Sequence, residues 1–331
     1  MKLKVLFLLF ISSSLCTEED FDPFSNDFVD YINQKQSRWI ANRSFDKKQI
    51  QLLENLFSGD NEPKITVEFT PTIHNEDEEL PESFDAREAW PDCADIIGFI
   101  RDQSTCGSCW AFSTAEAISD RICIHSNATR KVLVSAQDIL TCSSAGGCHG
   151  GTSVLAWEYW KNGYVTGGLY NDTNEGCKSY FLPPCNDHMN NCTNYVDTPE
   201  CVSQCDDSKV DYNQSKTYGH LSFRNGSING TVKQIQLEIL KNGPVQTTFT
   251  VYEDFAYYKS GIYQYTAGKE RSRHAVKIIG WGVEKEVEYW LIANSFNANW
   301  GEDGFFRMIR GKNDCGIEDV ANGGLPDFDL F

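Results

Sequence analysis

The distribution of cysteines is the feature that most limits how this chain can fold. Of its 331 residues 13 are cysteines, and none of them lies between residues 17 and 79. All but Cys16 and Cys315 fall within residues 93–205. Such a density is typical of a disulfide framework made in an oxidising compartment. We therefore expect an N-terminal part without disulfides, followed by a cross-linked body.

The N-terminus indicates how the chain reaches that compartment. Residues 1–16, MKLKVLFLLFISSSLC, carry two lysines, an apolar run and then small residues, which is the pattern of a secretory signal peptide. The apolar run of about ten residues is too short for a transmembrane helix, so no membrane anchor is expected. Glycosylation acceptors of the form Asn-x-Ser/Thr fit the same route. They are Asn42, Asn127, Asn171, Asn191, Asn213, Asn225 and Asn229. The sequence thus predicts a lysosomal or secreted protein.

Composition limits the partners of this protein. The net charge of −18 argues against nucleic acids and anionic membranes as ligands. It suits an acidic compartment, where protonation of carboxylates relieves their repulsion. Hydrophobic residues make up 40% of the chain and aromatic residues 13%, as expected for a packed globular body.

The acidic segment 17–79 has its own helical pattern. The run NDFVDYINQKQSRWIA places Phe28, Ile32 and Trp39 at helix-compatible spacing, and residues 46–57 repeat the pattern. An ordinary helical subdomain and a removable pro-segment both explain this pattern, and position alone does not choose between them.

From residue 80 onwards, expected helices give way to expected strands. Helices are expected at 108–125, 134–140, 152–163 and 232–244, and strands at 245–252, 274–283, 288–296 and 304–311, with a loop-rich stretch at 171–217. The predicted fold class is α+β, with a helical first half and a strand-rich second half.

Cys106 and Cys109, in RDQSTCGSCWAF, have a spacing that fits three uses. A zinc site needs a second pair in ligand spacing, and Cys142 and Cys148, with five residues between them and His149 beside them, are poorly placed for it. A thiol–disulfide redox pair should follow a strand in a βαβ unit, and no alternating strand precedes Gln103. The third use is one structural cysteine beside one nucleophile.

If Cys109 is a nucleophile, residues elsewhere in the chain are suited to assist it. Cys109 opens a predicted helix, whose N-terminus stabilises a thiolate. A thiolate nucleophile needs an acid/base partner, for which His274 is the candidate. Asn294 is suited to orient the imidazole, and the amide of Gln103 is suited to donate to an oxyanion.

Several longer motifs resemble those of the papain-type cysteine peptidases. These are DQSTCGSCWAF, GCHGG, HAVKIIGWG and YWLIANSF…WGEDGFF. Others, such as LPESFDAREAWPDC, AISDRICIHSN and VYEDFAYYKSGIYQ, resemble the cathepsin B group of that family more closely. The resemblance covers nearly all of residues 80–324, and DYINQKQSRWIA is similar to the short pro-region of that group.

This resemblance implies a two-domain papain-like fold whose interdomain cleft binds an extended peptide. It divides the chain into a signal peptide (1–16), an inhibitory pro-segment (17–79) and a peptidase domain (80–331) with a cleft-blocking insertion at about 177–205. It implies cysteine-type peptidase activity on peptide and protein substrates, with no metal or organic cofactor. The implied partners are these substrates, the chain's own pro-segment and cystatin-type inhibitors, and the implied state is a monomer.

The resemblance also assigns individual residues. Cys109, His274, Asn294 and Gln103 match the catalytic residues. Gly151 matches the backbone that pairs with substrate, and Trp300 matches the indole of the primed side. The implied disulfides are Cys93–Cys123, Cys106–Cys148, Cys142–Cys201, Cys177–Cys205 and Cys185–Cys192, which leave Cys315 as a free buried thiol.

The insertion departs from the cathepsin B pattern. Two adjacent histidines in that group bind the C-terminal carboxylate of the substrate, and the first of them pairs with an aspartate that matches Asp102. Here His188 matches the second histidine, but Asp187 replaces the first. Asn299 replaces the aspartate of a second latch. We expect a loosely held insertion, with less carboxydipeptidase and more endopeptidase activity.

Other departures lie in the substrate pocket and at the catalytic centre. Val320 replaces an acidic residue in the pocket for the second residue before the cut, which predicts a preference for apolar residues over arginine. Arg273 replaces a glycine and should disfavour an imidazolium at His274, while Phe296 replaces a shielding tryptophan. Two alternatives stay open: a secreted homologue that binds peptides but barely turns over, and a thiol–disulfide oxidoreductase.

Overall fold

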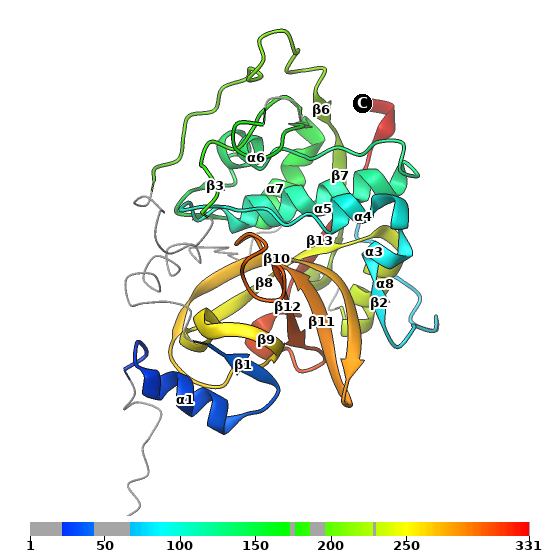
Figure 1. Cartoon of the computed structure of the whole chain (residues 1–331). Coiled ribbons are helices and arrows are strands. Elements are labelled where there is room, and N and C mark those ends of the chain that lie inside the picture. Colours follow the sequence, from blue (N-terminus) through cyan, green and yellow to red (C-terminus); the bar gives the residue numbers. More distant parts are fainter. Residues whose placement is uncertain (1–21, 43–66, 173–175, 186–195, 228–229, 331) are drawn as a thin grey trace, which may run out of the picture.

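The computed structural model describes residues 22–42, 67–172, 176–185, 196–227 and 230–330 (Figure 1). The expected helix at 46–57 lies outside these ranges. Across the described residues, none of the helices combines the length and the apolarity needed to cross a bilayer.

The first half of the body is helical. Its helices are α3 (Ala86–Ala89), α4 (Ala94–Ile97), α5 (Cys109–His125), α6 (Ala136–Cys142) and α7 (Ser153–Tyr159), with two small strand pairs, β3 (Gly146–Gly147) with β4 (Gly150–Gly151) and β5 (Tyr164–Val165) with β6 (Lys216–Thr217). The expected helix at 152–163 ends earlier, since α7 passes into a 3₁₀ turn and Gly163 takes a positive φ of 85°. That backbone conformation favours glycine and ends the helix.

The second half is built on a sheet. Its elements are β7 (Gly219–Arg224), α8 (Val232–Asn242), β8 (Val245–Tyr252), β9 (Tyr258–Tyr263), β10 (Glu270–Glu284), β11 (Val287–Ala293), β12 (Phe305–Ile309) and β13 (Ala321–Pro326). Short 3₁₀ helices lie at Pro91–Cys93, Trp160–Asn162, Asn225–Ser227, Glu253–Tyr257, Asp314–Gly316 and Phe328–Leu330. The sheet has nine strands. Eight of them follow the order β1-β9-β12-β11-β10-β8-β13-β7, where β1 is Trp39–Ala41 of the N-terminal segment, and the ninth, β2 (Phe84–Asp85), pairs with β10. The predicted α+β division into halves is confirmed.

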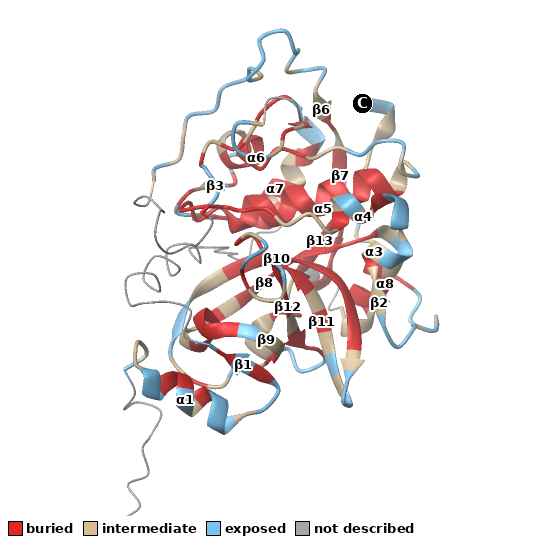
Figure 2. Cartoon of the chain, in the orientation of Figure 1, coloured by how far each residue is buried: buried red, intermediate tan, exposed pale blue. Residues whose placement is uncertain are grey.

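Helix α5 lies where the two halves meet (Figure 1). Every residue from Cys109 to Ile124 is buried, because helices of the first half cover one side and the sheet covers the other (Figure 2). The helix contacts β10 and β13 of the sheet. Its N-terminal residue is therefore held at the boundary between the halves.

The N-terminal segment packs on the sheet-bearing half. Helix α1 (Asn26–Lys35) buries Phe28, Val29 and Ile32 in the hydrophobic core of that half. Trp39 is not helical, which corrects the helical spacing expected for it. The amide of Gln36 bonds the backbone of Arg38 and Trp39 and ends the helix. Trp39 then begins β1 (Trp39–Ala41), which pairs with β9.

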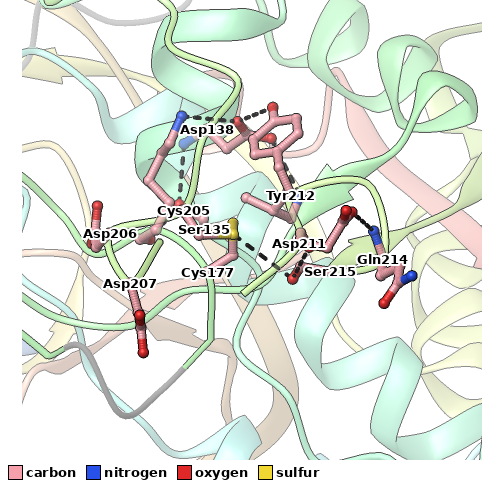
Figure 3. The surroundings of a disulfide bond; sticks show 12 residues. Ser135, Asp138, Cys177, Cys205, Asp206, Asp207, Asp211, Tyr212, Gln214 and Ser215 are labelled. Atoms are coloured by element: carbon pink, nitrogen blue, oxygen red, sulfur yellow. Dashed lines mark hydrogen bonds and ion pairs between the residues drawn. A yellow bond between two sulfur atoms is a disulfide. The ribbon is translucent and has the colours of Figure 1, made fainter. Parts of the chain in front are cut away.

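Four of the five implied disulfides lie among the described residues: Cys93–Cys123, Cys106–Cys148, Cys142–Cys201 and Cys177–Cys205. Cys185 is also in a disulfide, and its expected partner Cys192 lies outside the described ranges. Around the Cys177–Cys205 bridge, the Tyr212 hydroxyl donates to Asp138 Oδ1 at 2.7 Å (Figure 3). The bridge joins Cys177 to Cys205, and the hydrogen bond fastens Tyr212 to α6.

Candidate active site

Cys109 is the first residue of α5, and it is completely buried. Among the described cysteines only Cys109 and Cys315 stand outside disulfides, while Cys106 is bridged to Cys148. This pairing contradicts a redox pair of Cys106 and Cys109, and it is the one that a nucleophilic Cys109 requires. Cys315 is half-buried rather than buried as expected.

His274 lies on β10, the strand that faces this helix. Its neighbour Ala275 packs in the same hydrophobic cluster as Cys109. The imidazole Nε2 of His274 lies 2.8 Å from Oδ1 of Asn294, at the end of β11. Asn294 Oδ1 also accepts the Ser295 N–H at 2.8 Å, which fixes its amide with the oxygen toward the imidazole. Nε2 is therefore the protonated nitrogen of a neutral His274.

Phe296 covers this hydrogen bond. Its ring stacks on the His274 ring with centroids 4.9 Å apart and an interplanar angle of 26°. Trp300 meets Phe296 edge-on, with centroids 5.7 Å apart, and both residues are buried. The phenylalanine that replaces the expected tryptophan thus still shields the His–Asn pair from water.

Burial controls the protonation of His274. It lowers the pKa of His274 to about 4, and the hydrogen bond to Asn294 opposes this shift. Burial is the largest cause, since it penalises the charged imidazolium. In this state of the chain, His274 is neutral throughout the mildly acidic range.

Gln103 lies in the loop before Cys109 and is completely buried. Its Nε2 donates to the Cys106 carbonyl at 3.0 Å, and its Oε1 accepts the Ser295 hydroxyl at 2.7 Å. Its backbone carbonyl accepts the Tyr180 hydroxyl at 2.9 Å. The side chain is held in place by both halves of the molecule, and its amide N–H groups point toward the turn that precedes Cys109.

Gly151 lies against Trp110, the residue that follows Cys109. A Cβ atom at Gly151 would come within 2.3 Å of the indole ring, so only glycine fits there. The indole Nε1 donates to the Gly147 carbonyl at 3.1 Å. The β3–β4 pair is thus fixed beside the N-terminal turn of α5, against Trp110.

Two other expected substrate-binding residues are Val320 and His188. Val320 is half-buried, and its carbonyl accepts the Thr247 hydroxyl at 3.0 Å, one residue before Thr248. His188 and Asp187 lie outside the described residues.

Both carboxylate oxygens of Asp102 accept hydrogen bonds from described residues. One of its carboxylate oxygens accepts the Ser104 N–H at 2.7 Å. The other accepts the Cys185 N–H at 2.8 Å and the Asn297 side chain at 3.1 Å. Asn297 also donates to the Cys185 carbonyl at 2.9 Å. Asp102 and Asn297 therefore hold the backbone at Cys185, within the insertion.

Sequence reasoning missed two supports of the site. Ser295 holds both Asn294 and Gln103, and its position directly after Asn294 was the only signal. The second is a buried ion pair between Asp120 of α5 and Lys277 of β10; charged residues in otherwise apolar runs were the available signal. No group of three or more potential metal ligands comes together within the part of the chain that the structure describes.

Comparisons with known proteins agree with this geometry. Residues 80–325 match the family described as papain family cysteine protease. The chain is 45% identical over 314 residues to cathepsin B-like cysteine proteinase 4 of Caenorhabditis elegans, which covers 90% of this chain and 91% of the relative. It is 44% identical over 319 residues to proteinase 5 of that organism, with 90% and 89% covered.

Solved structures give the same result. ProCathepsin B S9 from Trypanosoma congolense is 33% identical, with a TM-score of 0.76 and coverage of 92% of this chain and 99% of that one. Procathepsin L 3 from the larval midgut of Tenebrio molitor is 20% identical, with a TM-score of 0.62 and 90% and 88% covered, and shows the fold alone. The predicted papain-like fold is confirmed, and the chain belongs to the papain family of cysteine proteases as a cathepsin B-like member.

Proposed function

We propose that this chain hydrolyses peptide bonds through a Cys109–His274 pair. The observation that carries the proposal is the His274–Asn294 hydrogen bond beneath Phe296, on the strand that packs beside the Cys109 end of α5. Since Nε2 of His274 bonds Asn294, we assign Nδ1 to proton transfer with Cys109. A fixed imidazole, oriented by a third group, is what nucleophilic catalysis by a thiol requires.

The reaction follows from these positions. The Cys109 thiol gives its proton to His274, and the thiolate attacks the peptide carbonyl carbon. Gln103 and the Cys109 backbone N–H donate to the oxyanion. As the C–N bond breaks, His274 returns the proton to the leaving amine and an acyl-enzyme remains. Water then adds to the acyl carbon while His274 takes its proton. As the C–S bond breaks, the acid product leaves and His274 returns the proton to the Cys109 sulfur.

We propose that residues 17–79 are an inhibitory pro-segment, removed near Glu79 or Leu80. Support comes from the pairing of β1 with β9 and from the procathepsin neighbours. Val67 and Phe69 also pack against the hydrophobic cluster that contains Cys109 and Trp110. Removal of this cover would bring water to His274 and relieve the burial that lowers its pKa. The proenzyme would thus be unreactive while its centre is already assembled.

We further propose that the enzyme is mainly an endopeptidase. Asp187 stands where the group has a carboxylate-binding histidine, and Asp102 already accepts hydrogen bonds from Cys185 and Asn297. Asp187→His should raise the ratio of carboxydipeptidase to endopeptidase activity, and Asn186→His is the matched control. An unchanged ratio in Asp187→His would contradict this part of the proposal.

Covalent labelling tests the nucleophile. After acid activation, an epoxide or vinyl-sulfone peptide inhibitor should label Cys109, and peptide mapping should find Cys106 still bridged to Cys148. Cys109→Ala should lose both labelling and hydrolysis. Labelling without hydrolysis would favour the peptide-binding homologue, for which Arg273 beside His274 is the reason.

We propose the secretory route for this protein on the strength of residues 1–16 and the disulfides.

A further inference from the structure

The last part of the proposed pro-segment, residues 72–78, lies along helix α8, away from the catalytic residues. Four side chains of α8 and its N-cap meet it, and they are Thr231, Gln234, Glu238 and Lys241. Their spacing of three, four and three residues puts them on one face of the helix. This row, which we call the α8 face, contains no residue assigned to catalysis.

The α8 face binds the backbone of His74 through one side chain. Gln234 Oε1 accepts the His74 N–H at 2.9 Å, and Gln234 Nε2 donates to the His74 carbonyl at 2.8 Å. The amide thus pairs with both polar groups of one residue, as a neighbouring β-strand would. Two residues earlier, the Thr72 N–H donates to the Ser222 carbonyl of β7 at 2.7 Å. Residues 72–74 are therefore held as an extended chain.

The side chain of His74 is bound as specifically as its backbone. His74 is 8% exposed, and its Nε2 lies 2.7 Å from Glu238 Oε2. The neighbouring Ile73 is 70% exposed, which is the alternation expected for an extended peptide with one face buried. The other oxygen of Glu238 accepts Arg121 Nη1 at 2.8 Å, and Asn242 donates to Oε2 at 3.0 Å.

Glu238 is held ionised at this place. Burial by itself would raise the pKa of Glu238, but Arg121 and the hydrogen bonds from His74 and its neighbours lower it to about 2. The carboxylate stays charged across the acidic range in which the proposed enzyme works. The arrangement is thus a preformed acceptor for an imidazole N–H, tied to α5 through Arg121.

We propose that the α8 face is a second binding site for the pro-segment, independent of the cleft, and that it recognises an extended peptide through a buried histidine. The occupant is the chain's own residues 72–78, and the site remains able to bind them after the cut. The inference rests on the proposed proenzyme, since it assigns those residues to the removable part. Glu79 is exposed directly after the bound stretch, so cleavage there would leave the contacts intact.

The test uses a synthetic peptide of residues 70–79 with a fluorophore at its N-terminus. The enzyme is the chain without its pro-segment, with Cys109 blocked by a covalent inhibitor that also fills the cleft. An added protease removes the pro-segment if the chain does not process itself. Fluorescence anisotropy should show saturable binding to the blocked enzyme. Removal of one hydrogen bond to a buried charge should weaken binding about tenfold or more, so the His74→Ala peptide should bind correspondingly worse.

Two matched controls make the result specific. The Ile73→Ala peptide should bind with unchanged affinity because that side chain faces solvent. Gln234→Ala in the enzyme should also weaken binding about tenfold or more, and a melting curve would establish that this variant is folded. Equal affinities of the His74→Ala and unmodified peptides, or binding only when the cleft is open, would overturn the inference. Failure of the catalytic proposal would appear separately, as absence of labelling at Cys109.

Discussion

Lys277 Nζ lies 2.8 Å from Asp120 Oδ2, and neither side chain is exposed to solvent. Asp120 follows Cys109 by three turns of α5 and so faces the same side of the helix. Lys277 follows His274 by three residues on β10, and its Nζ also donates to the Ile97 carbonyl at 3.0 Å. The ion pair therefore joins the helix that begins at Cys109 to the strand that carries His274.

Loss of one member of this ion pair should lower the free energy of unfolding. Lys277→Met leaves the Asp120 carboxylate buried without its cation, and breaking a buried pair costs about 3–5 kcal/mol. Equilibrium unfolding by denaturant at pH 5 should show that loss. The double variant Asp120→Leu/Lys277→Met removes both charges of the pair and should recover most of the lost stability. A Lys277→Met variant as stable as the parent would contradict the role assigned to this pair.

A second buried acid beside the pair should make stability depend on pH. Burial raises the pKa of Glu116 to about 7, although the charges of Lys277 and Arg101 oppose this shift. The folded state then holds this proton more tightly than the unfolded chain. Its contribution is complete below about pH 4.5 and is lost as the pH rises to about 7, which amounts to roughly 3 kcal/mol.

Glu116→Gln should remove that dependence. The variant should gain stability relative to the parent at pH 7 and differ little from it at pH 4, as measured by unfolding at both values. Glu82→Gln, at an exposed carboxylate, is the matched control and should change neither. A parent protein whose stability rises between pH 4.5 and pH 7 while Glu116→Gln follows the same curve would refute this assignment.

The orienting role of Asn294 predicts a kinetic effect. Asn294→Ala leaves His274 Nε2 without its acceptor, and loss of such a hydrogen bond corresponds to a tenfold to hundredfold drop in kcat. KM should change less, because Asn294 lies beneath Phe296 and away from the substrate. Phe296→Trp restores a larger shield and should keep kcat near the parent value. Unaltered kcat in Asn294→Ala would show that another group orients the imidazole.

The pocket residue Val320 predicts specificity. Val320→Glu should raise kcat/KM for peptides with arginine two residues before the cut, because a carboxylate can then pair with the guanidinium. Val320→Gln, which has the same size without the charge, should not. A parent enzyme that already prefers arginine there would count against the expected apolar preference. The readout is a pair of peptides that differ only at that position.

Much of the site could be predicted from local sequence. Cys109 precedes a strongly helical run, so its place at a helix N-terminus followed from pattern alone. His274 and Asn294 lie in adjacent strand runs that the pattern also predicted. What brings them within 2.8 Å is the pairing of β10 with β11, a long-range contact that periodicity does not encode.

Other features depend on tertiary contacts and could not be predicted. Trp39 had helical spacing, but the Gln36 side chain and the edge of β9 made it a strand residue. The acceptor triplet at Asn225 suits glycosylation in sequence, yet Asn225 is buried and its Nδ2 donates to the Glu318 carbonyl at 2.8 Å. His74 and Glu238 are 164 positions apart in the sequence, and no local sequence pattern predicts their contact.

Hydrolysis of two quenched peptides by the acid-activated protein, at about pH 5 and about pH 7, is the decisive test of the proposed peptidase activity. One peptide is blocked at its C-terminus and the other is free, and Cys109→Ala is the control. We expect cleavage of the blocked peptide at pH 5 by the parent chain and none by Cys109→Ala. Cleavage of neither peptide, with Cys109 still labelled by the inhibitor, would contradict the claim that this chain is a peptidase.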